Sequence, residues 1–368
     1  MEIISPLATI SQRYSDLRAF NFSQEIIMTK TMRRWTLDTF GVNAPFSLTE
    51  TDVPSPARGE VLVRTKAVSL NYRDKLMRES GMGLPVQFPF VPASDMAGIV
   101  EAVGEGVTRF APGDRVISTF HPGWIDDKPP GNARNPPYQS LGGFYPGVLA
   151  EYVAFPEDWF VAAPTSIDDS EASTLPCAGL TAWFALVERG KIKPGDTVLV
   201  QGTGGVSMFG LQIAAAQGAD VFVTSSGPEK LARAKALGAR HGIDRNAEDW
   251  VEAVYRLTND RGIDHIFEIA GGPHLGQSLK AVAVHGRISV IGVLEGFDLS
   301  GPAGPVLLKS PVIQGISVGH RRALEDFVRA VDRIGLKPVI DHRYTFSEVP
   351  AAFDHLDHGA FGKIVIEL

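Results

Sequence analysis

Cysteine is almost absent from this sequence of 368 residues, because Cys177 is the only one. A single cysteine excludes an intramolecular disulfide and a cysteine-rich structural zinc lobe. It is compatible with a reducing compartment. Residues 1–6 also lack the basic start and the apolar core of a secretion signal. We therefore expect a cytoplasmic protein.

A basic excess and a long apolar run are missing as well. The formal net charge is −7, which leaves no surplus of Lys and Arg to neutralise phosphates, so no nucleic-acid partner is expected. No apolar run reaches the roughly 18 residues of a membrane span, so no membrane partner is expected either. The remaining composition, 44% hydrophobic and 21% charged, is that of a globular protein long enough for two domains with separate cores.

A glycine-rich turn between a strand and a helix is the strongest local pattern. Residues 198–200 predict a buried strand, and residues 211–216 predict a helix. Backbone N–H groups at the start of such a helix can bind a pyrophosphate. The dinucleotide fingerprint G-x-G-x-x-G has Ser207 in place of its third glycine. The turn residues expected to contact the cofactor are Gly202, Thr203, Gly204, Gly205 and Val206.

Strands and helices alternate after this turn. Residues 220–224, 264–270 and 286–291 predict strands, and residues 229–237 predict a helix. The alternation predicts an α/β fold with a Rossmann-type, doubly wound parallel sheet built from right-handed βαβ units. The alternative is a glycine-rich turn in another α/β domain that binds no nucleotide.

The first part of the chain is rich in predicted strands from Arg33 onward, and their spacing predicts a small β-barrel. The segment 1–32 carries little pattern and is predicted to be a flexible extension, or the result of an upstream choice of start codon. The long loop 120–147 is rich in aromatic residues, which favours packing over disorder and suggests a functional loop. Further predicted elements are helices over 170–188, 322–334 and 349–356 and strands over 46–51, 60–68, 96–104, 115–117, 344–347 and 362–368.

Several motifs at matching separations resemble one family. Together they identify the chain as similar to the medium-chain dehydrogenase/reductase superfamily, in its zinc-independent, quinone-oxidoreductase-like branch. The resemblance covers about residues 33–368. It implies a GroES-like catalytic domain over 33–160 and 322–368, a Rossmann cofactor domain over 161–321, and commonly a homodimer. The motifs are Pro56-Ala-Arg-Gly-Glu-Val-Leu-Val, Asn71-Tyr-Arg-Asp, Asp95-Met-Ala-Gly-Ile-Val-Glu-Ala-Val-Gly, Pro112-Gly-Asp-Arg-Val, Ala150-Glu-Tyr, Gly202-Thr-Gly-Gly-Val and Phe361-Gly-Lys-Ile-Val.

The resemblance also locates the positions of a catalytic zinc site. In the zinc alcohol dehydrogenases, zinc is held by a Cys, by a His with its neighbouring Glu, and by a second Cys. The matching positions here are Asn71, then Ser94 with Asp95, and Cys177. Three thiolate, imidazole or carboxylate ligands are needed, and an amide and a hydroxyl are poor substitutes, so no zinc is expected. Cys177 is interpreted as a small buried hydrophobe.

The end of the second Rossmann strand indicates which nicotinamide cofactor is preferred. An NAD-binding domain offers a carboxylate there, whereas this chain has Ser226. Ser225, Ser226 and Lys230, with Arg245 after the third strand, could hold a 2′-phosphate. We expect NADP(H), with NAD(H) possible because Glu229 adjoins the site. The alternative is that Lys230 and Arg245 are only solvated surface charges.

Other positions match the family's nicotinamide-flanking segments, where small groups permit close approach. These positions are Thr181, Gly271, Gly272, Ile291, Gly292 and Val293.

Without a metal, hydrogen-bond donors must stabilise the negative charge that hydride transfer creates. Tyr72 is the candidate acid and Asn71 the candidate polarising group, although Asn71 could instead order a turn and Tyr72 could simply pack. Asp74 and Asp95 match positions near the cofactor and are expected to support the site.

Two histidines are weaker catalytic candidates. His121 and His320 could line the cleft between the domains, or could be ordinary polar residues.

Three functions remain open at this point. The first is a metal-free, NADPH-dependent reductase that delivers hydride to the β-carbon of an enone, quinone or enoyl thioester. The second is an alcohol dehydrogenase or ketone reductase. The third is a protein that binds the cofactor without turnover. In the first two, the partner is a small-molecule substrate.

Overall fold

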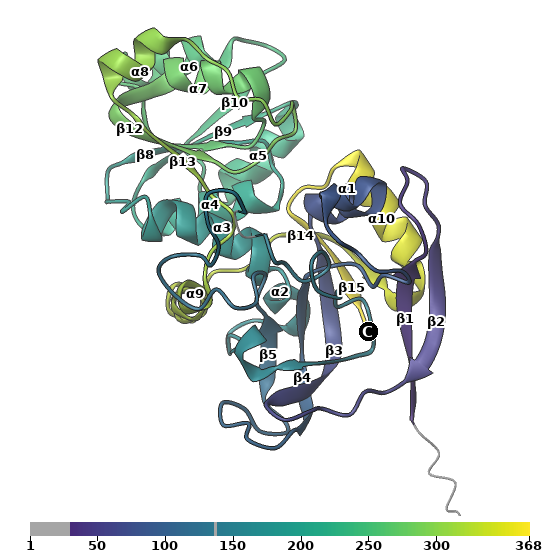
Figure 1. Cartoon of the computed structure of the whole chain (residues 1–368). Coiled ribbons are helices and arrows are strands. Elements are labelled where there is room, and N and C mark those ends of the chain that lie inside the picture. The colour runs from purple at the N-terminus through teal and green to yellow at the C-terminus, as the bar shows by residue number, and fades with distance from the viewer. Residues whose placement is uncertain (1–29, 136–137) are drawn as a thin grey trace, which may run out of the picture.

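The computed structural model describes residues 30–135 and 138–368 of the chain (Figure 1). Two sheets dominate it: one of six strands, drawn in teal and green, and one of seven strands that combines purple, blue and yellow segments. The predicted extension 1–32 lies outside the described residues except for residues 30–32, and strand β1 already begins at Thr31. No helix in the described part is long and apolar enough to cross a membrane.

The six-stranded sheet has the order β10-β9-β8-β11-β12-β13, and all of its neighbouring strands run parallel. The chain adds β9 and β10 on one side of β8 and β11 to β13 on the other. This is the predicted doubly wound arrangement, with its switch point between β8 and β11. The strands are β8 Thr197–Gln201, β9 Asp220–Ser225, β10 His241–Asp244, β11 Ile263–Glu268, β12 Val282–Val290 and β13 Val312–Gly315.

Helices cover both faces of this sheet, because successive strand residues point to opposite sides. Val198 and Val200 belong to the core shared with α3, α4 and α9, whereas Leu199 belongs to the core shared with α6 and α7. In Figure 1, α6 to α8 lie on one side of the sheet and α3 and α4 on the other. The helices are α3 Leu180–Trp183, α4 Gly205–Ala216, α5 Pro228–Ala236, α6 Trp250–Thr258, α7 Leu275–Ala281, α8 Ala303–Lys309 and α9 Arg321–Ile334.

The predicted helix over 170–188 is helical, but it is not one regular α-helix. It starts as α2 (Asp169–Ala172), and two segments on either side of α3, Leu175–Gly179 and Phe184–Glu188, have the wider π winding. Pro176 has no N–H with which to continue the hydrogen bonds of α2, which is one reason for the change of winding.

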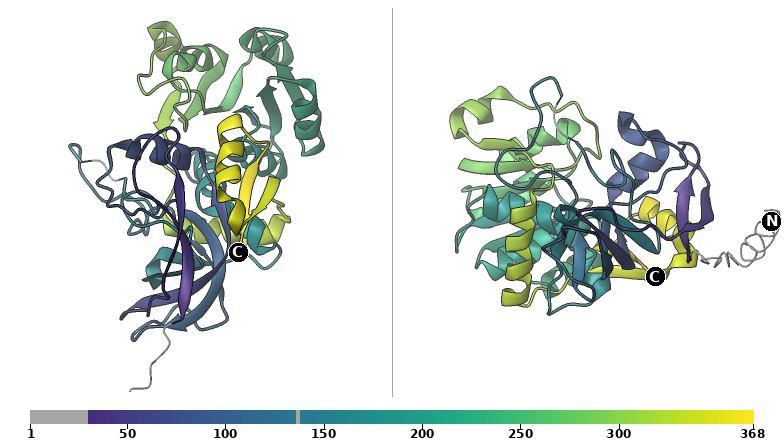
Figure 2. Two further views of the ribbon diagram at one scale, coloured as in Figure 1. Left: turned by 90° about the vertical axis from the view of Figure 1, so that its right-hand side faces the viewer. Right: turned by 60° about the horizontal axis from the view of Figure 1, so that its bottom comes forward.

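The seven-stranded sheet has the order β14-β15-β3-β4-β5-β7, and β6 pairs with β3. Strand β15, from the end of the chain, lies between β14 and β3, so that yellow and purple elements adjoin in both views of Figure 2. Strands β1 and β2 form a separate antiparallel pair. The elements are β1 Thr31–Leu37, β2 Phe46–Asp52, β3 Glu60–Leu70, α1 Tyr72–Ser80, β4 Asp95–Val103, β5 Arg115–Ser118, β6 Tyr152–Pro156, β7 Phe160–Ala162, β14 Ile340–Thr345, α10 Val349–His358 and β15 Lys363–Glu367.

The predicted strand 344–347 is correct for its first half only. Strand β14 ends at Thr345, and Phe346–Glu348 forms a 3₁₀ turn. The carboxylate of Glu348 accepts hydrogen bonds from the backbone N–H and the hydroxyl of Thr345, and this cap ends the strand.

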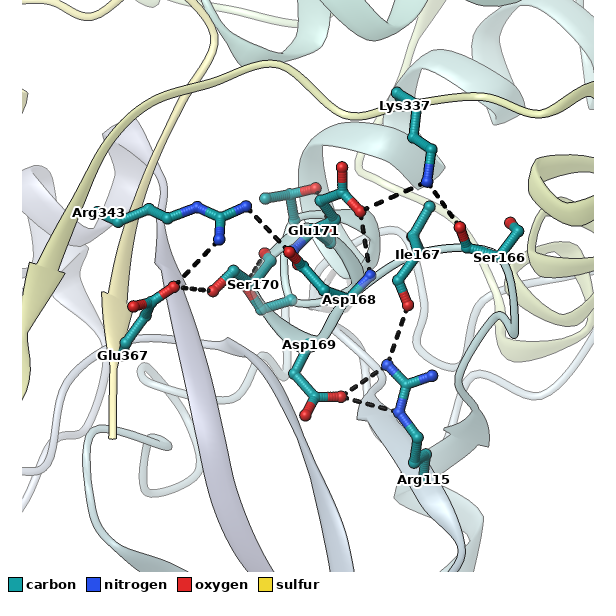
Figure 3. Close-up of polar contacts among 12 residues, drawn as sticks. Arg115, Ser166, Ile167, Asp168, Asp169, Ser170, Glu171, Lys337, Arg343 and Glu367 are labelled. Carbon is teal, nitrogen blue, oxygen red and sulfur yellow. Dashed lines mark hydrogen bonds and ion pairs between the residues drawn. The ribbon is translucent and has the colours of Figure 1, made fainter.

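A polar network holds the segment where the chain passes from the seven-stranded sheet toward the six-stranded one (Figure 3). Arg115 of β5 binds the Asp169 carboxylate at 2.6 Å. Arg343 of β14 pairs with both Asp168 and Glu367. The start of α2 is therefore tied to three strands of the seven-stranded sheet.

Candidate functional site

The glycine turn after β8 leads directly into the N-terminus of α4. Gly202 has a φ of +70°, a left-handed conformation that favours glycine, and Gly204 is the N-cap of α4 without a side-chain cap. A Cβ added to either glycine would meet nothing within 4 Å. The first turn of α4 carries no acidic residue. The start of α4 therefore fits the pyrophosphate of a dinucleotide.

The opposite side of the turn packs against strand β15. The N–H of Gly362 donates a 2.9 Å hydrogen bond to the carbonyl oxygen of Thr203. A Cβ on Gly205 would lie 2.5 Å from Cδ of Lys363, so this glycine allows close packing of the two parts. Val206, the next residue, is partly buried against the core.

Ser207, in place of the third fingerprint glycine, does not obstruct the turn. Its side chain is buried, and its hydroxyl donates a 2.7 Å hydrogen bond to the carbonyl oxygen of Gln201. This hydrogen bond joins the first turn of α4 to the last residue of β8.

The residues expected to select the cofactor lie at the carboxyl ends of β9 and β10. The N–H of Arg245 donates to the carbonyl oxygen of Ser225, and the side chain of Asn246 donates to the carbonyl oxygen of Ser226. Ser225 is buried, whereas Ser226 and Arg245 are exposed. Lys230 is partly exposed in α5, which begins two residues after Ser226.

The predicted nicotinamide-flanking glycines lie together after β11 and β12. Gly271 and Gly272 have φ values of +70° and +52°. A Cβ on Gly292 would lie 2.0 Å from the carbonyl oxygen of Ile269, and one on Gly271 would lie 2.8 Å from that of Gly292. The two loops therefore approach backbone to backbone. Their neighbours Ile291 and Val293 are partly buried, and Thr181 is buried in α3.

The carboxylate of Glu268, which was not predicted as a site residue, orders this region. Glu268 is fully buried and accepts hydrogen bonds from the N–H groups of Ala270 and Gly271 and from the Ser278 hydroxyl. Burial alone would raise its pKa, but hydrogen bonds from His274 and these other donors hold the pKa below its usual value. The sequence pattern does not single out Glu268, because the same strand also carries Asp264 and His265.

Asp74 orders the start of α1 as a supporting residue. Its carboxylate accepts a 2.8 Å hydrogen bond from the N–H of Asn71, and it pairs with Arg73. Burial raises the pKa of Asp74, and the Arg73 charge opposes that shift.

Arg73, also not predicted, fixes the long aromatic loop. It is buried and donates to the carbonyl oxygens of Leu141 and Gly142 and to the Ser140 hydroxyl. These bonds hold the end of the loop against α1. The ends of the loop are buried, as expected from its aromatic residues, whereas residues 126–135 are all exposed.

A buried lysine lies beside Asn71 and was not among the predicted site residues. The ammonium of Lys363 donates hydrogen bonds of 2.5 Å each to the Asn71 side-chain oxygen and to the carbonyl oxygen of Leu70. Lys363 is only 4% exposed and Asn71 only 7%. Burial lowers the pKa of Lys363, while the Asp95 carboxylate opposes this shift.

Asp95 is fully buried in the same cluster. One carboxylate oxygen accepts from the Ser94 hydroxyl at 2.6 Å and the other from the N–H of Cys177 at 2.9 Å. Burial raises the pKa of Asp95 to about 6, although Lys363 opposes the rise. Burial and the Asp95 charge raise the pKa of the Cys177 thiol.

The zinc-ligand positions thus come together, but their chemistry does not fit a zinc ion. The Asn71 oxygen binds an ammonium group and both Asp95 oxygens already accept hydrogen bonds, which leaves the Cys177 sulfur as one of the three donors that a zinc site needs. Within residues 30–135 and 138–368, no three His, Cys, Asp or Glu side chains gather to hold a metal ion. The expectation that zinc is absent rests on this donor chemistry and stays a prediction.

The two aromatic candidates near the loop differ in exposure. Tyr72 begins α1 and is 43% exposed, so its hydroxyl is accessible to solvent.

His121 is buried, and its Nε2 lies 3.2 Å from the Ser317 hydroxyl. It lines a cavity of about 300 Å³ together with Trp124, Phe184 and Ser317. Burial and the charge of Arg73 lower the pKa of His121 to about 4. It is therefore neutral at pH 7.

His320 serves as a helix cap. Its Nδ1 accepts a 3.0 Å hydrogen bond from the N–H of Ala323 at the start of α9, and its ring contacts those of Trp124 and Phe184 edge-on. It does not line the cavity beside His121. A catalytic role for His320 stays a prediction that these contacts do not support.

A parallel nucleotide-type sheet joined to a second sheet with a buried polar cluster is the architecture of a two-domain dehydrogenase. Two family models match the chain: an alcohol dehydrogenase GroES-like domain over residues 57–165 and a zinc-binding dehydrogenase domain over residues 205–334. The first model covers β3 to β7 of the seven-stranded sheet, and the second covers β9 to β13 of the six-stranded sheet.

Individual relatives agree with these models. A zinc-type alcohol dehydrogenase-like protein of Schizosaccharomyces pombe is 39% identical over 87% of this chain and 94% of its own length. Quinone oxidoreductase of Homo sapiens is 26% identical over 86% of this chain and 91% of its own length. The crystal structure of a putative alcohol dehydrogenase from Sinorhizobium meliloti has a TM-score of 0.90 and 68% identity, covering 93% of this chain and all of that one.

The chain belongs to the medium-chain dehydrogenase/reductase superfamily and is an oxidoreductase of that family. Members of the family bind nicotinamide cofactors. The predicted combination of a GroES-like domain with a Rossmann-type parallel sheet is confirmed.

Proposed function

We propose that this chain is a zinc-independent reductase that uses NADP(H) to deliver hydride to an activated C=C bond or a quinone. The observation that carries the proposal is the buried cluster at the zinc-ligand positions, where an amide and a hydroxyl replace metal ligands and the Lys363 ammonium binds the amide. In an enone or quinone the acceptor carbon is already electrophilic. The negative charge that forms on the distant oxygen then needs only hydrogen-bond donors for its stabilisation.

The preference for NADP(H) rests on the carboxyl ends of β9 and β10. Ser226 offers no carboxylate that would repel a 2′-phosphate, and the exposed Arg245 lies beside it with Lys230 nearby in α5. Asp244 is the register partner of Ser225, and its carboxylate would repel a 2′-phosphate. For this reason the proposal keeps NAD(H) as a weaker substrate.

A second candidate is interconversion of an alcohol and a ketone. Several relatives carry alcohol dehydrogenase in their names, and the accessible hydroxyl of Tyr72 is a group that could exchange a proton with a substrate oxygen. In this reading, hydride goes to the carbonyl carbon itself. A cofactor-binding protein without turnover is the third candidate.

We also propose a homodimer formed along β13. This strand is the edge of the six-stranded sheet, and Val312 and Ile313 on it are exposed. The neighbouring helix α8 exposes Leu307 and Leu308. An apolar edge strand is a ready surface for a second copy of the same strand.

One experiment separates the candidate reactions. Purified, chelator-treated protein receives NADPH or NADH with quinones, enones and ketones, or NADP⁺ with secondary alcohols, and the absorbance of the reduced nicotinamide is followed. Turnover of enones or quinones at full rate after chelation is expected. Turnover with ketones and alcohols alone would replace the first reading by the second, and loss of activity on chelation would contradict zinc independence. If no acceptor is turned over although the cofactor binds tightly, the third candidate is favoured.

A further inference from the structure

The ammonium of Lys363 determines which way the Asn71 amide faces. Lysine carries only donors, so the group it contacts at 2.5 Å must be the amide oxygen of Asn71. The amide nitrogen then points away from Lys363. The second acceptor, the carbonyl oxygen of Leu70, fixes the ammonium itself.

The amide nitrogen of Asn71 is a buried donor that lacks a hydrogen-bond partner among the described residues. It is close enough to Asp95 to help lower the pKa of that carboxyl, but it does not reach hydrogen-bond geometry with it. Both Asp95 oxygens already accept from Ser94 and Cys177. Buried donors are rarely left unpaired in folded proteins, and an unpaired one points to a ligand that supplies the acceptor.

The cluster also lies between segments that fit the cofactor. The side chain of Lys363 runs across Gly205 at the glycine turn. Cys177, which binds Asp95 through its N–H, precedes the buried Thr181 by four residues on the same helical segment. A substrate oxygen near the nicotinamide would therefore lie on the Asn71 side of the cluster.

We propose that Lys363 is a positioning residue for hydride transfer: its buried ammonium holds the Asn71 amide so that the amide nitrogen donates to the oxygen of the hydride acceptor. This inference rests on the proposed function. The C4–H bond of NADPH breaks and its hydride forms a new C–H bond at the β-carbon of the enone. The C=C electron pair shifts to join the α-carbon and the carbonyl carbon, and the C=O π pair moves onto the oxygen as an enolate. A proton from water then adds to the α-carbon, and the C=O bond forms again. The products are the saturated carbonyl compound and NADP⁺. The Asn71 amide nitrogen, held in place by Lys363, stabilises the enolate oxygen.

A double-mutant cycle tests this role. K363M keeps the length of the apolar stem and removes the ammonium. It is expected to lower kcat for an enone or quinone by about 10²-fold, as the loss of one oxyanion donor does, with little change in KM. N71A should cost as much, and N71A/K363M should cost no more than N71A alone, because the lysine acts through the amide.

Controls separate this role from others. NADPH affinity, measured by fluorescence titration without substrate, should stay within about threefold in K363M. A tenfold or larger increase in the dissociation constant of NADPH would mean that Lys363 acts on the cofactor phosphates. Additive losses in the double variant would also overturn the proposal. If K363M fails to fold, K363C alkylated with bromoethylamine restores an ammonium at the same place. Its activity should then recover, while the same treatment leaves the wild type unchanged.

The wild-type assay distinguishes the two proposals. A wild type that turns over enones or quinones together with a fully active K363M refutes the positioning role alone. A wild type that turns over none of them refutes the proposed function and this inference with it.

Discussion

Gly204 and Gly362 pair as an isolated parallel β-bridge between the glycine turn of the six-stranded sheet and the residue that precedes strand β15 of the seven-stranded sheet. The turn that fits the cofactor is thereby fixed directly to the strand that carries Lys363. The two glycines at the start of α4 differ in their surroundings. A Cβ on Gly204 would face open space, whereas a Cβ on Gly205 would face Lys363.

G204A and G205A should therefore differ in their effects. In G205A the new methyl group meets Cδ of the anchored Lys363, and the free energy of unfolding should fall by about 1–3 kcal/mol. In G204A the methyl group meets no protein atom, so stability should change by less than about 0.5 kcal/mol while cofactor affinity falls about tenfold. Urea denaturation and fluorescence titration measure the two quantities. Wild-type cofactor affinity in G204A would place the pyrophosphate elsewhere.

S226D should shift the cofactor preference toward NADH, because it adds a carboxylate where a 2′-phosphate is expected. The ratio of kcat/KM for NADPH to that for NADH is the measurement. N43D, in the turn between β1 and β2, adds the same charge far from the site and serves as the control. An unchanged ratio in S226D would show that the phosphate site is wrongly placed.

The raised pKa of Asp95 has a consequence for stability. A carboxyl whose pKa is higher in the folded than in the unfolded state binds its proton more tightly when folded, so its contribution to stability is lost as pH rises. The window runs from about 3.8 to about 6. Relative to D95N, which does not titrate, the wild type should lose about 2.4 kcal/mol of unfolding free energy between pH 4 and pH 7. Denaturant titrations of both proteins at these pH values provide the test, and a pH-independent difference would contradict the shifted pKa.

H121Q should leave the pH dependence of kcat/KM between pH 5 and pH 8 unchanged in shape. Burial and Arg73 keep His121 neutral throughout that range, so it cannot be the titrating acid or base there. Its position in the cavity wall beside Ser317 allows effects on KM. If an inflection between pH 6 and pH 8 disappeared in H121Q, His121 would have to be restored as a proton-transfer residue.

L308E should convert the proposed dimer into a monomer. Leu308 is 84% exposed next to the edge strand β13, and a carboxylate there would be buried against the partner copy. Light scattering after size-exclusion chromatography gives the molar mass. V42E changes a residue that is 66% exposed near the other sheet and should leave the mass unchanged. A wild type that is monomeric would remove the dimer proposal.

Local patterns were sufficient to predict much of the fold. Strand β8 before the glycine turn and strand β9 after α4 each contain a continuous apolar run, and the alternation of such strands with helices predicts the parallel sheet. By contrast, helix α6 was not predicted, although Asp249 caps it. The π-helical segments were also missed, because their winding depends on neighbours that the local pattern does not reveal.

The candidate site was predicted less completely because it is assembled from distant parts of the chain. Asn71 and Asp95 were found through motifs, but Lys363 is 292 residues from Asn71 and is brought to it only by the pairing of β15 with β3. Glu268 and Arg73 act through buried hydrogen bonds that have no periodic signature. Their roles follow from tertiary packing alone.

The position of β15 in the seven-stranded sheet also affects the order in which the protein can be built on the ribosome. Strand β15 lies between β14 and β3, yet it is synthesised after all six strands of the parallel sheet. Domains commonly fold as units during synthesis. The six-stranded sheet can thus form while the seven-stranded sheet still lacks an interior strand, and the lysine that lies beside Asn71 is added only at the end of synthesis.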